Sequence, residues 1–162
     1  HAQRLANEMQ PKFPFLIEPV RKNEDAVRDA DLIVTATSSH EPVISKNWIA
    51  AGAHVNAIGT HSPNSREIDS STMAAARIFV DRRESALNES GDYLLAAKEG
   101  IVSPESIVGE IGELLIGTKT GRTSATEITL FKSLGLAIED VACAEYLYHQ
   151  AQSQNVGSWV EF

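Results

Sequence analysis

Two segments of the sequence combine residue types that suit ligand binding and proton transfer. Thr35-Ala36-Thr37-Ser38-Ser39 is small and rich in hydroxyls, so a flat cofactor could approach its backbone and bond through ribose or phosphate oxygens. The stretch from Gly59 to Glu67 contains His61, whose side chain can exchange a proton near neutral pH. Many buried strands end in threonine or serine, and many exposed loops carry an incidental histidine, so a structural role is the alternative for both. We expect Arg66 and Glu67 to fix this loop rather than to act in catalysis.

Other polar groups are expected to be structural. Ser90 or Asp92 would cap a helix at a turn. Glu110 and Glu113 could do acid–base work, but a solvated helix face is the preferred interpretation. The mixed-charge segment Asp81-Arg82-Arg83-Glu84 is expected to be solvated as well.

The two segments lie at the carboxyl ends of apolar, β-branched runs of the kind found in strands that are covered on both faces. Ala30–Ser39 and His54–Gly59 are two of these runs, and Arg77–Asp81 is a third. Helical segments lie between them, which predicts an α/β fold with a doubly wound parallel sheet. Ligands bind beyond the carboxyl ends of the strands in such sheets, which is where both candidate segments lie.

The remaining elements are predicted from periodicity and capping residues. A short edge strand is expected over Phe15–Val20, where Pro14 and Pro19 limit its pairing. The predicted helices are His1–Met9, Glu24–Arg28, Ser45–Ala51, Asp69–Ala76, Arg83–Asn88, Asp92–Gly100, Glu105–Ile116 and most of Glu127–Gln152, with Gly135 as a possible break.

Composition excludes several classes of protein. The formal net charge of −8 argues against nucleic acid and against anionic membrane surfaces as partners. No apolar run approaches the roughly 20 residues that span a bilayer. Cys143 is the single cysteine and no histidines show a HExxH spacing, so we predict neither a disulfide nor a metal site. A cytoplasmic location is expected.

Several sequence segments, considered together and in their order along the chain, resemble the ornithine cyclodeaminase/mu-crystallin family over roughly Ala26 to Gln152. These segments are Ala30–Ser39, Gly52–Gly59, Pro63 with Arg66–Asp69, Val80-Asp81, Glu89–Asp92, Gly109–Glu113, Gly121–Ser124 and Glu127–Gly135. The resemblance implies a Rossmann-type NAD(P)-binding domain, a second domain for substrate binding and dimerisation, and a homodimer as the full-length protein. It also implies that the chain, which begins at His1, starts inside that protein.

The upstream part would hold the first strand, its glycine-rich turn and the second strand that selects between NAD and NADP. The Rossmann-type sheet is therefore expected to be incomplete, with carboxy-terminal helices returning toward the missing substrate and dimerisation domain. We expect residues 1–124 to be a partial NAD(P)-binding domain, 125–152 a carboxy-terminal helical segment and 153–162 a loose tail. The isolated chain is expected to be inactive.

The resemblance also implies roles for individual residues. Cofactor contacts fall on Thr37, on Ser133 and on the run Val55, Asn56, Ala57 and Ile58, while Glu89 and Leu134 border the substrate. Ornithine cyclodeaminases of this family carry an acid–base aspartate where this chain has His61, which is our candidate for proton transfer.

The expected substrate is a small amino acid or imino acid, and the expected cofactor is NAD or NADP. Three functions stay open: oxidation or cyclodeamination of an amino acid, reduction of an imino acid, and mu-crystallin-like ligand binding without catalysis.

Overall fold

The computed structural model describes residues 1–160. Its strands are β1 (Leu32–Thr35), β2 (His54–Ala57), β3 (Arg77–Val80), β4 (Ile107–Glu110) and β5 (Thr129–Lys132). Its α-helices are α1 (Ala2–Met9), α2 (Asn23–Val27), α3 (Ser70–Ala75), α4 (Arg83–Glu89), α5 (Gly91–Lys98), α6 (Ile111–Leu115) and α7 (Ala137–Gln154). Short 3-10 turns are η1 (Gln10–Lys12), η2 (Lys46–Trp48) and η3 (Pro104–Ser106).

Within residues 1–160 the strands form one five-stranded sheet in the order β1-β2-β5-β3-β4, with every pairing parallel. The predicted α/β class with a parallel, Rossmann-like sheet is therefore confirmed. The last strand in sequence, β5, lies between β2 and β3. The last residues of the strands are in register across the sheet, in the order Thr35, Ala57, Lys132, Val80 and Glu110. The carboxyl ends of all these strands consequently meet at one edge.

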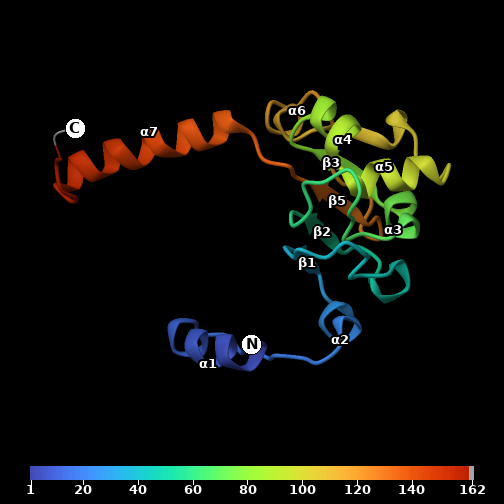
Figure 1. Ribbon diagram of the computed structural model, residues 1–162, viewed down its shortest axis with the longest axis horizontal. Helices are drawn as coiled ribbons and strands as arrows, with labels where there is room; N and C mark the ends of the chain where they lie inside the picture. Colours follow the sequence, from blue (N-terminus) through green and yellow to red (C-terminus); the bar gives the residue numbers. More distant parts are fainter. Residues whose placement is uncertain (161–162) are drawn as a thin grey trace.

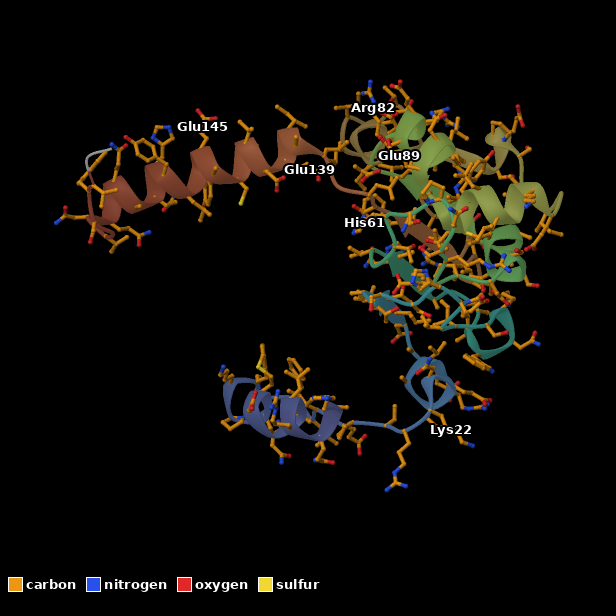
Figure 2. All side chains as sticks on the ribbon, viewed as in Figure 1. Lys22, His61, Arg82, Glu89, Glu139 and Glu145 are labelled. Carbon is orange, nitrogen blue, oxygen red and sulfur yellow. The ribbon has the colours of Figure 1, made fainter. Side chains whose placement is uncertain are left out.

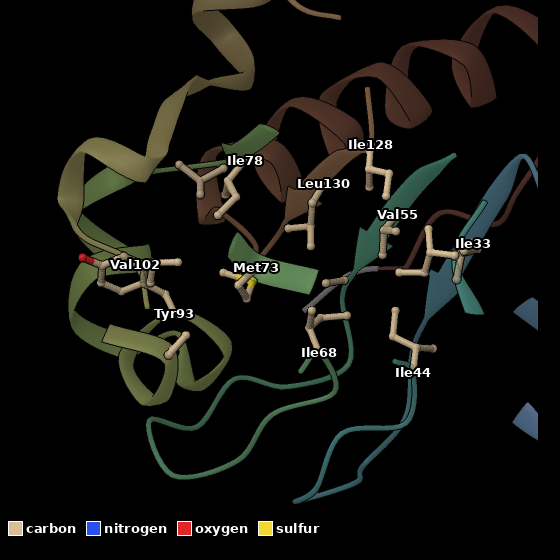
Figure 3. Packing of buried hydrophobic residues seen from close by; sticks show 14 of the residues in the cluster. Ile33, Ile44, Val55, Ile68, Met73, Ile78, Tyr93, Val102, Ile128 and Leu130 are labelled. Atoms are coloured by element: carbon tan, nitrogen blue, oxygen red, sulfur yellow. The ribbon is translucent and has the colours of Figure 1, made fainter. Parts of the chain in front are cut away.

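One face of the sheet carries the hydrophobic core (Figure 3). Ile33, Val55, Leu130 and Ile78 project from four neighbouring strands and are at most 6% exposed. Side chains from the connecting segments pack on them, among them Ile44, Ile68, Met73, Tyr93 and Val102. On the opposite face, Leu32 and Val34 of the edge strand β1 are 60% and 56% exposed, because successive side chains of a strand alternate between faces.

Helices α1 and α7 lie apart from the sheet, and α7 projects away from it (Figure 1). In α7 only Gln150 and Ala151 are partly buried, and its exposed apolar side chains include Ile138, Val141 and Leu147. Among the helices of residues 1–160, none combines the length and hydropathy needed to cross a membrane.

Three secondary-structure predictions were wrong. Phe15–Val20 forms no strand. Glu105–Ile116 is not one helix, since η3, β4 and α6 follow one another there. Glu127–Gln152 contains β5 before α7 begins at Ala137. Strands β4 and β5 each contain a residue that is uncommon in buried strands, Gly109 and Lys132.

The strands predicted at Ala30–Ser39, His54–Gly59 and Arg77–Asp81 are confirmed, although each is shorter than its apolar run. Ser45–Ala51 is helical only at η2, Lys46–Trp48. The predicted division at residue 125 stays a prediction, but the segment after it contributes a central strand to the sheet before its helix begins. In the predicted loose tail, Ser153 and Gln154 belong to α7, and residues 161 and 162 lie outside the described part of the chain.

Candidate functional site

The candidate site lies along the carboxyl edge of β1, β2 and β5. Just beyond the strands, the amide of Ile58 donates to the carbonyl of Thr35 at 2.9 Å, and the amide of Ser133 donates to the carbonyl of Ala57 at 3.2 Å. The three chain segments therefore continue side by side past the end of the sheet. This brings Thr37, Ile58 and Ser133, which are far apart in sequence, into one row.

A single carboxylate joins the first two segments. Glu67 is fully buried, and its Oε1 accepts from the amide of Thr37 at 2.5 Å while its Oε2 accepts from the amide of Gly59 at 2.8 Å. A Cβ on Gly59 would lie 2.3 Å from both the nitrogen and the oxygen of Thr37. Glycine is thus required for this close approach, and Glu67 fixes the loop as the sequence predicted.

The predicted cofactor residues differ in what they can offer a ligand. Thr37 is exposed, Ile58 is 39% exposed and Asn56 is half-buried. Val55 and Ala57 are fully buried, backbone included, so they can shape this edge only from beneath.

A groove of about 240 Å³ runs beside the edge strand and reaches Thr37. Its walls come from α2, from β1 and from the segment after β1, with Asn23, Val27, Val34 and Val43 among the lining residues. The groove and the row of segments beyond the strands meet at Thr37.

Asn56 is held by a chain of polar contacts on the half-exposed face of the sheet. Its Oδ1 lies 3.2 Å from Nε2 of His54, and Nδ1 of His54 lies 2.7 Å from the hydroxyl of Thr129. Arg122 donates to the same hydroxyl at 3.0 Å. His54 therefore fixes the orientation of a predicted cofactor residue.

Asp81 organises the turn after β5. Its Oδ2 accepts from the hydroxyl of Ser133 at 3.1 Å and from the amides of Leu134 and Gly135 at 2.6 and 2.7 Å. Gly135 has φ of 84°, a left-handed conformation that favours glycine. Asp81 is 4% exposed, so its prediction as a solvated residue was wrong. Burial follows from its position directly after the buried strand β3.

The loop that carries His61 is attached at both ends to buried charged groups. The Asp92 carboxylate accepts from the Thr60 hydroxyl at 2.9 Å, and from the amides of Glu67 and Ile68 at 2.8 and 2.9 Å. Lys132 donates to the Thr60 carbonyl at 2.8 Å. The expected cap of α5 is Ser90, which accepts from the Tyr93 amide. Sequence reasoning gave Asp92 only a capping role.

His61 and Glu89 both lie on the side of the sheet body from which α7 departs (Figure 2). Both are exposed. A Cβ on Gly91 would lie 2.0 Å from the carbonyl oxygen of Ser65 and 2.4 Å from that of Ser62, so the loop packs directly on the start of α5. Glu89 is two residues from that contact, and the structure thus brings it toward the His61 loop.

The paired carboxylates of β4 and α6 have a structural role. Glu113 accepts from the amide of Glu110 at 2.8 Å, and Glu110 accepts from the amide of Arg83 at 2.8 Å. Both glutamates are half-buried, so their prediction as a solvated helix face was wrong. Across residues 1–160, no group of three or more His, Cys, Asp or Glu residues is placed to hold a metal ion. The absence of a metal requirement stays a prediction.

Comparison with known proteins gives consistent matches. The model of the family described as "Ornithine cyclodeaminase/mu-crystallin family" matches residues 1–155. The Delta(1)-pyrroline-2-carboxylate reductase of Bacillus cereus is 40% identical over 162 residues, which cover 99% of this chain and 50% of that protein.

Solved structures of relatives superpose closely. The Thermococcus litoralis Delta(1)-pyrroline-2-carboxylate reductase in complex with NADH and L-proline has a TM-score of 0.93 at 40% identity, over 98% of this chain and 49% of that one. An archaeal alanine dehydrogenase dimer with bound NAD has a TM-score of 0.87 at 37% identity, over 99% and 49%. The chain therefore spans about half the length of these relatives.

Proposed function

The chain belongs to the ornithine cyclodeaminase/mu-crystallin family, and from this premise we propose that it forms the dinucleotide-binding part of an oxidoreductase that reduces a cyclic imino acid with NADH. The observation that carries the proposal is the junction of Thr37 and Gly59 through Glu67. This junction holds together the two segments that follow the adjacent parallel strands β1 and β2. The side of these segments that faces away from the sheet stays free, and ligands of open parallel sheets bind beyond the carboxyl ends of the strands.

The residues at this edge fit a nicotinamide dinucleotide. Small and hydroxyl-bearing side chains, Thr37 and Ser133, flank the backbone after β2, so a flat ring system can approach it closely. Ile58 offers an apolar contact, and the half-buried Asn56 offers an amide. When bound, the nicotinamide supplies a hydride to the imine carbon or accepts one from the amine-bearing carbon. NAD rather than NADP is proposed because the two structures compared above hold NADH and NAD.

Reduction of a carbon–nitrogen double bond needs a proton on nitrogen as well as a hydride on carbon. We assign the proton transfer to His61, because it is an exposed imidazole on a loop whose two ends are attached to buried groups. Glu89 lies at the adjoining turn and is proposed to face the substrate together with Leu134.

Two observations support a proposal about the rest of the enzyme: the relatives are about twice as long as this chain, and α7 exposes apolar side chains. We propose that the exposed apolar side chains of α7 contact a substrate domain formed by upstream sequence, and that the complete protein is a homodimer in the cytoplasm. The chain boundaries proposed from the sequence are 1–124 for the dinucleotide-binding part, 125–152 for the returning segment and 153–162 for the tail, and the returning segment adds β5 to the dinucleotide-binding sheet before α7 begins.

The test is a spectrophotometric assay of the complete polypeptide with NADH and Delta(1)-pyrroline-2-carboxylate. Loss of NADH absorbance and formation of L-proline are expected, with NADPH as the parallel cofactor. Reduction of NAD⁺ by L-ornithine or L-alanine, without imine reduction, would replace the proposal by the amino-acid oxidation alternative. Saturable binding of NADH with no turnover in either direction would favour a non-catalytic ligand-binding protein.

A further inference from the structure

A buried ion pair connects the central strand of the sheet to the start of α5. Nζ of Lys132 lies 3.0 Å from Oδ2 of Asp92, and the two side chains are 1% and 0% exposed. Removing two charges from water is costly, and an apolar pair of similar volume often gives equal or greater stability. Fold stability alone therefore does not explain this ion pair. The other groups that Lys132 and Asp92 bond indicate what else the pair does.

The ammonium group of Lys132 also contacts Thr60. It donates to the carbonyl of Thr60 at 2.8 Å and lies 3.3 Å from the hydroxyl of that residue. The hydroxyl in turn donates to Asp92 at 2.9 Å. Thr60 is the residue directly before His61, so the position of the His61 backbone depends on these bonds.

Asp92 fixes the other end of the same loop. Its Oδ1 accepts from the amides of Glu67 and Ile68, while its Oδ2 faces Thr60 and Lys132. One carboxylate thus bonds the chain on both sides of residues 61–66. The loop is also seated on Gly91, where any side chain would collide with its carbonyl groups.

Lys132 is at the same time the last residue of β5, immediately before Ser133 and Leu134. The turn assigned to the cofactor and substrate and the loop assigned to proton transfer therefore share one buried anchor. An apolar replacement could fill the space of Lys132 but could not donate to the Thr60 carbonyl.

We propose that Lys132 and Asp92 are positioning residues that set the placement of His61 relative to the Ser133–Leu134 turn. The inference rests on the proposed role of His61 in proton transfer. A misplacement of about 1 Å can lower a rate by roughly 100-fold. Replacing Lys132 is therefore expected to lower turnover while leaving dinucleotide affinity nearly unchanged, because its side chain bonds Thr60 and Asp92 and none of the residues assigned to the dinucleotide.

The experiment compares the complete polypeptide with its variants Lys132→Met, Thr60→Val, His61→Asn and Lys132→Met/His61→Asn. Turnover is measured with saturating imine and NADH, affinity by NADH titration, and folding by thermal unfolding, all at a temperature where each variant is folded. Lys132→Met should lower kcat by at least about 10-fold, with the NADH Kd within about 2-fold of the unmodified protein. Thr60→Val, which keeps the carbonyl contact, should lower kcat less but in the same direction.

The double variant distinguishes positioning from general destabilisation. If Lys132 acts through His61, then Lys132→Met should have little further effect on kcat once His61 is replaced, because effects of residues that act as one unit do not add. A folded Lys132→Met protein with unchanged kcat would overturn the inference. If Lys132→Met does not fold, unchanged kcat in Thr60→Val overturns it instead. Unchanged kcat in His61→Asn alone would refute the role of His61 in the proposed function, and with it the basis of the inference.

Discussion

The backbone amides of Thr37 and Gly59 donate to the two oxygens of one buried carboxylate, that of Glu67. The two amides come from segments that follow neighbouring parallel strands, β1 and β2. This arrangement fixes the wall of the candidate dinucleotide site without occupying it, because the carboxylate approaches from the buried side.

Replacing Glu67 by Gln should weaken this wall. One of the two amides would then face the NH₂ group of the glutamine, and a buried donor left without an acceptor costs about 1–3 kcal/mol. We expect the free energy of unfolding to fall by that amount and the NADH Kd to rise. Urea denaturation and NADH titration measure the two effects. Glu41→Gln, at an exposed position, is the matched control, and equal behaviour of the two variants would contradict this role for Glu67.

Gly59→Ala tests the close approach of the two segments directly. The added methyl group would lie 2.3 Å from backbone atoms of Thr37, and overpacking of this kind typically costs about 1–3 kcal/mol. The variant should lose stability and bind NADH more weakly.

Gly112→Ala is the control for the glycine substitution. Gly112 lies in α6 with nothing within 4 Å of an added Cβ, so alanine should stabilise the protein by roughly 0.5–1 kcal/mol. Thermal unfolding of both variants gives the comparison. A Gly59→Ala protein as stable as the unmodified one would show that the approach of the two segments is not constrained.

Asp81→Asn should disturb the Ser133–Leu134 turn. Asparagine keeps only one oxygen, for which the Arg82 amide competes with the three donors of the turn, and that oxygen no longer belongs to a charged carboxylate. Loss of this arrangement should raise the NADH Kd by about 10-fold, which corresponds to about 1.4 kcal/mol. Asp29→Asn, at an exposed position, should leave the Kd unchanged. A Kd that is equal in both variants would remove Asp81 from the account.

The pH dependence of stability should include a contribution from Glu99. The Ser70 hydroxyl, followed by Arg66, holds the pKa of Glu99 below its ordinary value of 4.5. The folded chain therefore binds this proton less readily than the unfolded chain, and the contacts stabilise the fold above pH 4.5. This stabilisation is lost as the pH falls through the lowered pKa.

Glu99→Gln isolates that contribution. The difference in Tm between the unmodified protein and the variant should be largest near neutral pH and should shrink as the pH falls below 4.5. Thermal unfolding across an acid pH series gives the measurement. A difference that is constant across the series would mean that the contacts of Glu99 do not favour its charged form.

Sequence patterns predicted the parts of this fold in which local signals and burial agree. β1 and β3 are mostly apolar, β2 alternates polar and buried apolar residues, and small or titratable residues follow the first two. The patterns did not predict β5, because Lys132 interrupts its apolar run and the strong helix α7 follows closely. A buried lysine is recognisable only when its partner is known, and Asp92 is 40 residues away along the chain.

The same limit explains what was missed at the site. Thr37, Ile58 and Ser133 were predicted from the family resemblance, and strand order brings their segments together. Glu67 was expected to fix its loop, but its joining of Thr37 and Gly59 depends on β1 and β2 pairing in register. Asp81 was predicted to belong to a charged surface segment because the groups that donate hydrogen bonds to it lie more than 50 positions later in the sequence.

Hydrogen–deuterium exchange of the complete polypeptide with and without NADH tests the central claim most directly. Slower exchange is predicted in peptides that cover residues 36–40, 58–62 and 133–136. Little change is predicted in peptides that cover residues 93–102, in and after helix α5. Protection that is absent from all three segments, while NADH is bound elsewhere, would contradict the assignment of this sheet edge to the dinucleotide.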